Sequence, residues 1–309
     1  MSYRQVNYAL RPAKSVERKM LNETFRCLTP FSRVGTYRYI GFGSNFFSDF
    51  ILFHRSLGIS NMTSIEHDKP ARERFRFNLP FHCVELKFGE SGEILPRLDW
   101  NIRTLLWLDY DRPLDLEVLA DVELFCASAI SGSVLVVTVD ARPENPSKDR
   151  AELLKESLGD RVPLDLVEKN LDGWGTAHTF RRIINNQIQE SLAKRNGALH
   201  QGSKMLYRQL FNFNYQDSSK MLSVGGLLYD EGQSDIMQAC GFSSLQFLRE
   251  DEHPYEIQVP NLTLREMRHI DSKLPNINVP GIASWIPKED LERYSLIYRY
   301  FPSFVEAEL

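Results

Sequence analysis

Five short apolar segments, each followed by a helical pattern, constrain the fold of this chain most strongly. They are RYIGFG (38–43), MTSIEH (62–67), HCVELKF (82–88), RTLLWLDY (103–110) and SVLVVTVD (133–140). Most are apolar throughout rather than alternating, which is typical of strands that are buried on both faces of a parallel sheet. The sequence therefore predicts an α/β fold with five parallel strands flanked by helices.

The segments around these strands predict how the chain is organised. Residues 1–36 have a basic start and a helical pattern, and we expect them to form an N-terminal helical cover. Residues 37–309 should form one larger domain. Within it we expect a helical insert of about three helices at 149–200, a β-hairpin at 204–231 and a helical tail at 261–309.

The overall charge excludes a general attraction to polyanions. Of the 309 residues 42% are hydrophobic and 25% are charged, and the formal net charge is −4. Nucleic acid could therefore be held only through local basic groups, although acidic neighbours suggest solvated helix faces instead. The two basic groups are Arg11, Lys14, Arg18 and Lys19, and His178, Arg181, Arg182, Lys194 and Arg195.

The cysteines and the longest apolar run indicate the cellular environment. The four cysteines contain no CxxC pair, so neither a zinc site nor a disulfide framework is expected. The first residues lack an apolar signal core, and the run VLVVTV at 134–139 is too short to span a bilayer. We expect a cytoplasmic protein without membrane contact.

The stretch YIGFGSN after the first strand contains the most suggestive motif. Gly41 and Gly43 allow a tight turn in which bare backbone can approach a ligand, although such turns also serve packing alone. Glu66 ends the second strand 23 residues after Gly43, where a carboxylate can accept hydrogen bonds from a ribose. Phe46 stands where a dinucleotide fingerprint has its third glycine, which disfavours a dinucleotide cofactor.

From residue 37 to about 230, these motifs resemble the class I, Rossmann-like S-adenosylmethionine-dependent methyltransferases. The resemblance implies a seven-stranded sheet, made of the five parallel strands and the C-terminal hairpin. It also implies that S-adenosyl-L-methionine is the cofactor, with FGESGEILPRLDW (88–100) on the adenine side. The chain departs from the family at Tyr39, where an acid is frequent, and at Asn45, where a third glycine is frequent. The cofactor-binding residues implied are Gly41, Phe42, Gly43, Ser44, Glu66, His67, Glu90, Ser91 and Asp109.

The end of the fourth strand supplies candidate catalytic groups. Asp109, Tyr110 and Asp111 lie at the carboxyl edge of the predicted sheet, where open α/β folds bind their ligands. A carboxylate there can orient an acceptor or take its proton, and Asp109 is the first candidate. A strand-end aspartate that caps the next turn is the alternative interpretation.

A metal site is the weaker hypothesis for the same edge. In catechol-type O-methyltransferases, acids after strands four and five bind magnesium, and Asp109 and Asp140 are similarly placed. Ala141 stands where a third ligand is expected, so we predict no metal.

The sequence thus predicts a methyltransferase that methylates oxygen on an unidentified acceptor, with a small molecule as the expected partner. The segment DYDRP at 109–113 lacks the NPPY-like motif of amino-methylating branches, which favours oxygen. Two alternatives stay open: a non-catalytic S-adenosylmethionine or nucleotide-binding sensor or scaffold, and a nucleic-acid-modifying methyltransferase. The sequence does not disclose the oligomeric state.

Overall fold

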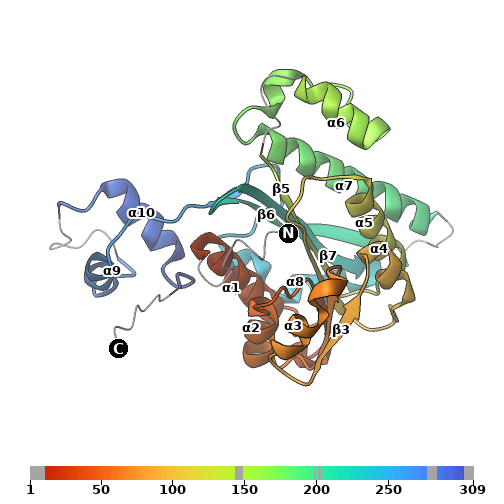
Figure 1. Cartoon of the computed structure of the whole chain (residues 1–309), viewed down its shortest axis with the longest axis horizontal. Helices are drawn as coiled ribbons and strands as arrows, with labels where there is room; N and C mark the ends of the chain where they lie inside the picture. Colours follow the sequence, from red (N-terminus) through yellow and green to blue (C-terminus); the bar gives the residue numbers. More distant parts are fainter. Residues whose placement is uncertain (1–10, 143–148, 198–199, 201–202, 277–283, 303–309) are drawn as a thin grey trace.

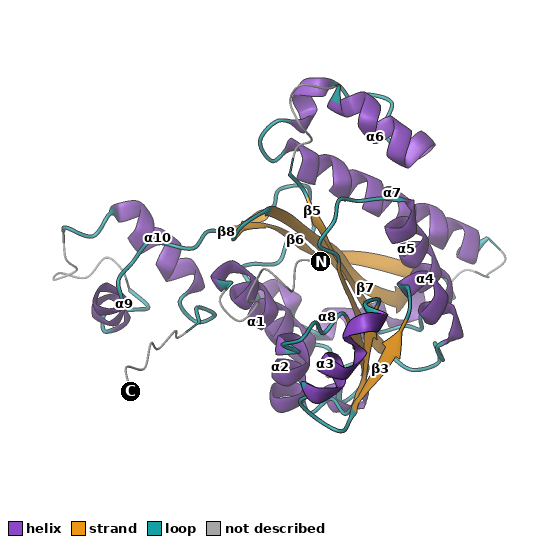
Figure 2. Cartoon of the chain, viewed as in Figure 1, coloured by secondary structure: helices purple, strands orange, loops and turns teal. Residues whose placement is uncertain are grey.

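One mixed sheet organises the molecule, with helices on both of its faces (Figure 2). The computed structural model describes residues 11–142, 149–197, 200, 203–276 and 284–302. The strand order is β3-β2-β1-β4-β5-β7-β6-β8. The strands are β1 (Arg38–Gly41), β2 (Asn61–Glu66), β3 (Val84–Phe88), β4 (Thr104–Asp109), β5 (Val134–Asp140), β6 (Met205–Gln216), β7 (Lys220–Asp230) and β8 (Tyr255–Ile257).

The predicted α/β fold is confirmed, with one correction to the strand count. Strands β1 to β5 are parallel, and β7 runs antiparallel between β5 and β6, as expected for a terminal hairpin. The sheet has eight strands rather than seven, because β8 adds a parallel edge strand beside residues 213–215 of β6. Strand β8 has three residues, too few to produce a recognisable alternation.

The helices divide between the two faces of the sheet. Helices α4 to α7 contribute to the buried cluster on one face, and α1, α2, α3 and α8 to the cluster on the other (Figure 1). The helices are α1 (Pro12–Arg26), α2 (Ser48–Leu57), α3 (Arg72–Phe77), α4 (Ser91–Ile94), α5 (Leu116–Ser128), α6 (Arg150–Leu158), α7 (Gly175–Asn196), α8 (Ser234–Ala239), α9 (Leu264–Asp271) and α10 (Lys288–Ile297). No helix in these described ranges is long and apolar enough to cross a membrane.

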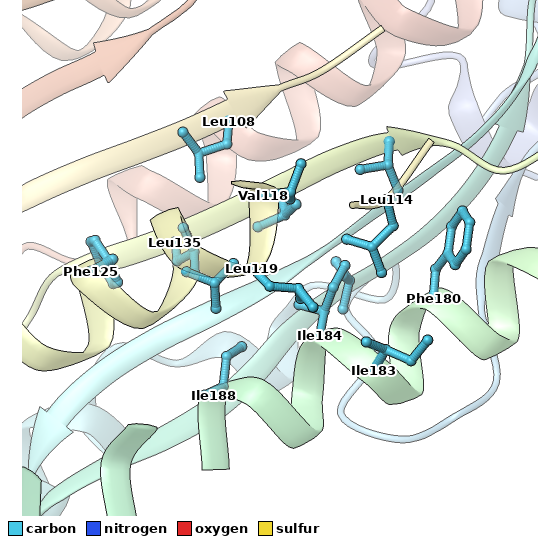
Figure 3. Close-up of a cluster of buried hydrophobic side chains, with 14 of the residues drawn as sticks. Leu108, Leu114, Val118, Leu119, Phe125, Leu135, Phe180, Ile183, Ile184 and Ile188 are labelled. Carbon is cyan, nitrogen blue, oxygen red and sulfur yellow. The ribbon is translucent and has the colours of Figure 1, made fainter. Parts of the chain in front are cut away.

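Helices α5 and α7 form the main apolar layer on their face of the sheet (Figure 3). In α7 the buried residues Phe180, Ile183, Ile184 and Ile188 recur at helical spacing, so they share one stripe that faces α5. Burial of each such side chain contributes about 1.5 to 3 kcal/mol to folding. This packing holds the loop after β4 against the sheet.

The segment 149–200 contains fewer helices than expected. Its first and last parts form α6 and α7, but the part between them contains only two short 3₁₀-helices, at Gly159–Arg161 and Glu168–Leu171. The tail contributes α9 and α10, which share a small buried cluster and lie beside the body in Figure 1. Tyr300 then packs edge-on against Phe247, with ring centroids 5.6 Å apart, so the aromatic end of the tail contacts the body.

Helix α1 is anchored by a residue from the distant hairpin turn. Its own N-cap, Arg11, makes no side-chain capping hydrogen bond. Instead, the carboxylate of Asp217 accepts hydrogen bonds from the backbone N–H groups of Ala13 at 3.0 Å and Lys14 at 3.1 Å. These bonds satisfy two backbone donors that have no partner within the helix, and they place a negative charge at its positive end. The cap therefore fixes where α1 crosses the sheet.

Candidate functional site

A cavity of about 400 Å³ opens at the carboxyl ends of β1 to β4. The strand order reverses between β1 and β4, and open α/β sheets bind ligands at such a point. Ten of the sequence-predicted residues line the cavity, whereas Gly41 and Asp140 do not. The ten are Phe42, Gly43, Ser44, Glu66, His67, Glu90, Ser91, Asp109, Tyr110 and Asp111.

The turn after β1 is packed so tightly that its second glycine cannot carry a side chain. The N–H of Gly43 donates to Ser64 Oγ at 3.0 Å, and its carbonyl accepts from the N–H of Phe47 at 2.8 Å. A Cβ at Gly43 would lie 2.4 Å from Phe47 Cδ1 and 2.7 Å from Ser64 Oγ. Glycine is therefore required here, and the turn presents backbone to the cavity.

Gly41 serves packing beneath the cavity. A Cβ there would lie 2.5 Å from the hydroxyl oxygen of Tyr39. The Tyr39 hydroxyl in turn donates to the carboxylate of Asp49 on α2. Tyr39, Phe50 and Phe53 make edge-on ring contacts with centroids 4.9 Å apart, which buries this hydroxyl under α2.

Glu66 is a buried carboxylate with neutral hydrogen-bond partners. Its side chain accepts from Ser64 Oγ at 2.8 Å, and only 7% of the residue is exposed. Burial raises the pKa of Glu66 to about 7, although the hydroxyl of Ser64 and the backbone N–H of Gly43 oppose the rise. The cavity thus contains an acceptor that gains from any hydroxyl donor that binds to it.

Asp49 and Arg18 place opposite charges in the same cavity, and sequence analysis identified neither in this role. Asp49 comes from α2 and Arg18 from α1, and both line the cavity. Burial raises the pKa of Asp49 to about 6, and the nearby Arg18 cation lowers it. The sequence did contain a signal for Asp49: Tyr39 stands where the family frequently has an acid. The Tyr39 hydroxyl donates to Asp49, so the acid at this place comes from α2 and not from the strand.

Asp109 is held by a buried lysine from α1. Lys14 Nζ lies 2.6 Å from Asp109 Oδ1 and 2.8 Å from Glu17 Oε2, and it donates to the hydroxyl of Tyr215 at 3.0 Å. The ammonium group also lies 4.3 Å from the ring centroid of Trp107. Lys14 is only 1% exposed, so the ion pair orients Asp109 at the cavity wall.

The two residues after Asp109 differ in what their side chains contact. The hydroxyl of Tyr110 donates to Asp121 at 2.5 Å and lies 3.1 Å from Ser91 Oγ, and its ring meets Phe42 edge-on at 5.1 Å. Tyr110 therefore forms a wall of the cavity. Asp111 is exposed and has no hydrogen-bond or ion-pair partner among the residues that the structure describes.

The geometry gives no support to the metal hypothesis. Asp140 lies outside the cavity lining and is paired with Arg142, whose Nε lies 2.8 Å from Asp140 Oδ2. Asp109 is paired with Lys14. Within the described ranges, no group of three or more His, Cys, Asp or Glu residues is placed to hold a metal ion.

The basic groups on α1 and α7 are used largely inside the molecule. On α7, Arg182 pairs with Asp165 at 2.9 Å, Lys194 with Glu123 at 2.8 Å, and Arg195 donates to two backbone carbonyls. On α1, Arg11 pairs with Asp217, Lys14 with Asp109, and Lys19 donates to the carbonyl of Phe301. These cations therefore have partners within the protein, whereas binding to nucleic acid would require them to contact a phosphate backbone.

Comparison with known families agrees with this geometry. A family model described as "Putative O-methyltransferase" matches residues 6–309. The chain belongs to this family. The match covers both sides of the sheet, α1 and the C-terminal tail, and it confirms the methyltransferase resemblance seen in the sequence. No curated protein matches the chain.

Two of the solved structures that match this chain contain S-adenosyl-L-methionine or SAH. Trm1 from Pyrococcus horikoshii with S-adenosyl-L-methionine is 14% identical with a TM-score of 0.44, and the match covers 72% of this chain and 56% of that one. This O-methyltransferase family member therefore spans little more than half of the Pyrococcus chain. An O-methyltransferase from Bacillus cereus in complex with SAH is 12% identical with a TM-score of 0.38, covering 72% of this chain and 82% of that one.

Proposed function

We propose that this chain binds S-adenosylmethionine in the cavity at β1 to β4 and methylates an oxygen atom of a small-molecule acceptor. The observation that carries the proposal is the combination of charges in one cavity. An isolated buried carboxylate, Glu66, lies beside the Gly43 turn, and the oppositely charged pair Asp49 and Arg18 lines the same space. The cofactor combines a ribose diol with a zwitterionic amino acid, so its polar groups fit this set of residues.

Glu66 is the proposed ribose contact. Two hydroxyl groups of a ribose can donate to one carboxylate, and such bonds favour its ionised form. The neutral hydrogen-bond partners of Glu66 leave room for this gain, because no cation in the described structure pairs with it. We propose His67 next to it, and Glu90 and Ser91 after β3, as further cofactor contacts.

Asp49 and Arg18 are the proposed contacts for the amino acid part. A carboxylate can accept from the ammonium group, and a guanidinium can donate to the carboxylate of the ligand. Because both residues are buried or nearly so, these interactions act at a lower effective dielectric than in water. Phe42, Gly43 and Ser44 would then provide the backbone surface against which this part lies.

Asp111 is the proposed proton acceptor, and Asp109 the orienting group. When bound, S-adenosylmethionine supplies an electrophilic methyl group, and an acceptor oxygen that takes this methyl leaves S-adenosylhomocysteine behind. The acceptor hydroxyl must lose its proton, and a carboxylate within hydrogen-bond reach can take it. Asp109 is engaged by Lys14, whereas Asp111 is exposed at the cavity without a described partner.

The test is a thermal shift with S-adenosylhomocysteine, because a ligand that binds only the folded state raises the melting temperature. We expect a clear rise for the wild type and little rise for Glu66→Ala. The matched control is Glu85→Ala, which removes an exposed carboxylate of β3 that pairs with Lys87. A full shift in Glu66→Ala would place the ribose elsewhere.

A second measurement separates catalysis from sensing. S-adenosylmethionine with a tritiated methyl group is incubated with the protein and a cell extract, and label is counted separately in the small-molecule and nucleic-acid fractions. A catalyst labels an acceptor, whereas a sensor shows the thermal shift and labels nothing. Label in RNA or DNA would instead support the nucleic-acid-modifying alternative.

A further inference from the structure

A second cavity of about 300 Å³ lies next to the first, under α6. Its walls come from the loop after β4, from Arg142 after β5, from α6, from Leu171 and from the start of α7, so segments distant in sequence meet here. Arg112 lines both cavities, so the two spaces share one wall residue. The volume is at the lower end of the range that small-molecule sites occupy.

Most of the second cavity is apolar. Leu114, Leu154, Leu171 and Phe180 contribute buried side chains from four different segments. Figure 3 shows Leu114 and Phe180 at the same end of the buried cluster. A small apolar body can therefore be removed from water here, and each buried CH₂ of such a ligand contributes about 0.8 kcal/mol.

Two arginines from different segments, Arg142 and Arg150, line this cavity. Arg142 follows β5, and its Nε and Nη2 bind Asp140 at 2.8 and 2.5 Å. Arg150 begins α6, and its Nε and Nη2 bind Glu168 and Asp172 at 2.5 and 2.7 Å. Within the described residues, Nη1 of each guanidinium has no partner.

These carboxylates orient the two guanidinium groups without using all their donors. Only one carboxylate, Asp115, lies in the lining itself, against three arginines. An anionic group at the edge of the cavity could accept from the remaining N–H groups of Arg142 and Arg150. A cationic ligand would find only the carboxylate of Asp115 in the lining, and that carboxylate is paired with Arg112.

We infer that the second cavity binds the methyl acceptor, and that this acceptor is an apolar hydroxy compound with an anionic group. The apolar body would lie against Leu154 and Phe180, and the anion would face Arg142 and Arg150. Arg112, shared by both cavities, would then lie beside the path between acceptor and cofactor. This inference rests on the proposed function, because it names the substrate class of the same reaction.

The test compares ligands of equal size and different charge. Binding of 4-hydroxyphenylacetate, its neutral amide and the cation tyramine is measured by calorimetry, both on the free protein and with S-adenosylhomocysteine added, and binding of S-adenosylhomocysteine itself is measured first. We expect the acid to bind about tenfold more tightly than the amide, and tyramine to bind least. Phenyl phosphate is included to separate a phosphate preference from a carboxylate preference.

Two arginine variants and a matched control identify the residues responsible. Arg142→Gln should reduce the preference for the acid by about five- to tenfold and leave the affinity for S-adenosylhomocysteine unchanged. The Arg142 side chain is 62% exposed but its partner Asp140 is buried, so urea unfolding of the variant is measured alongside; the backbone N–H of residue 142 still donates to Asp140, at 2.9 Å in the wild type. Arg150→Gln should act similarly, whereas Arg161→Gln, which breaks an exposed pair with Glu190 outside the cavity, should not.

The outcomes distinguish this inference from the proposed function. Equal binding of the acid and its amide would overturn the inference, as would an unchanged preference in both Arg142→Gln and Arg150→Gln. If the acid preference held but S-adenosylhomocysteine did not bind, the proposed methyl transfer would be refuted while the anion site would stand.

Discussion

Replacement of Glu66 by glutamine should make the empty protein more stable and the ligand weaker, and these opposite signs test the assignment of the site. Glutamine keeps nearly the size of the side chain and can still accept from Ser64 Oγ, which now lies 2.8 Å from the carboxylate. The substitution removes the ionisable carboxyl group, so the side chain at residue 66 no longer takes up or releases a proton. Burial raises the pKa of Glu66 from 4.5 to about 7 in the folded protein.

The magnitude follows from this change in pKa. A carboxyl whose pKa is raised by folding holds its proton more tightly when folded, so its contribution to stability is present below pH 4.5 and is lost as the pH rises towards 7. The loss amounts to about 3 kcal/mol in the free energy of unfolding. At pH 8, Glu66→Gln should therefore be more stable than the wild type by up to this amount, and near pH 4.5 the two should converge.

The ligand response should have the opposite sign. Hydrogen bonds to a charged acceptor contribute about 1.5 to 3 kcal/mol, against about 1 kcal/mol for a neutral pair. Glu66→Gln should therefore bind S-adenosylhomocysteine about tenfold more weakly at pH 8. The wild type should also lose affinity as the pH falls through 7, because the ribose hydroxyls favour the ionised carboxylate, and the variant should lose this dependence.

Urea unfolding at pH 5 and pH 8, with calorimetric titration of S-adenosylhomocysteine, measures both effects. Glu85→Gln serves as the control, because that side chain is 63% exposed and pairs with Lys87. The reasoning fails if the stability of Glu66→Gln relative to the wild type is no greater at pH 8 than at pH 5. It also fails if the variant binds the ligand as tightly as the wild type does.

Two further substitutions test the packing that forms the cavity. Lys14→Met should destabilise the fold by about 3 to 5 kcal/mol in urea unfolding, because it leaves the buried carboxylate of Glu17 without its cation. Adding Glu17→Gln should recover part of this loss of stability. If the two substitutions instead lower the stability additively, the pairing of Lys14 with Glu17 is contradicted. Gly43→Ala should lose about 1 to 3 kcal/mol of stability and most of the thermal shift with S-adenosylhomocysteine, since its Cβ would lie 2.4 Å from Phe47. Gly92→Ala on α4 is the control, because the nearest atom to its Cβ would be 3.8 Å away, and equal effects of the two alanines would remove the steric argument.

The sheet was predictable from the sequence because its strands are buried on both faces. Burial forces continuous apolar segments, and β4 and β5 preserve that pattern almost without interruption. Strand β8 was not predictable in this way. Its existence depends on the pairing of Tyr255–Ile257 with the edge of β6, and three residues carry no periodic signal of their own.

The candidate site divides along similar lines. Gly43, Glu66 and Asp109 lie at the carboxyl ends of three parallel strands, and these ends meet at one edge of the sheet, so topology alone gathers the three residues. Arg18 and Asp49 reach the cavity, and Lys14 reaches Asp109 at its wall, through helix packing instead. Their positions depend on contacts such as the cap that Asp217 gives to α1, which links residues about 200 positions apart.

Helix α1 therefore has a larger role than that of a cover. Lys14 pairs with Asp109 at the cavity wall, and Arg18, one turn further along the same helix, lines the cavity itself. The turn between β6 and β7 caps this helix through hydrogen bonds, and the helix contacts the end of β4 through the Lys14–Asp109 ion pair. The hairpin, α1 and the end of β4 are therefore joined by direct contacts. We propose that α1 folds with the sheet as one unit. Its removal would leave Asp109 without the Lys14 cation and would expose the apolar face of β6, so loss of the helix should abolish folding as well as ligand binding.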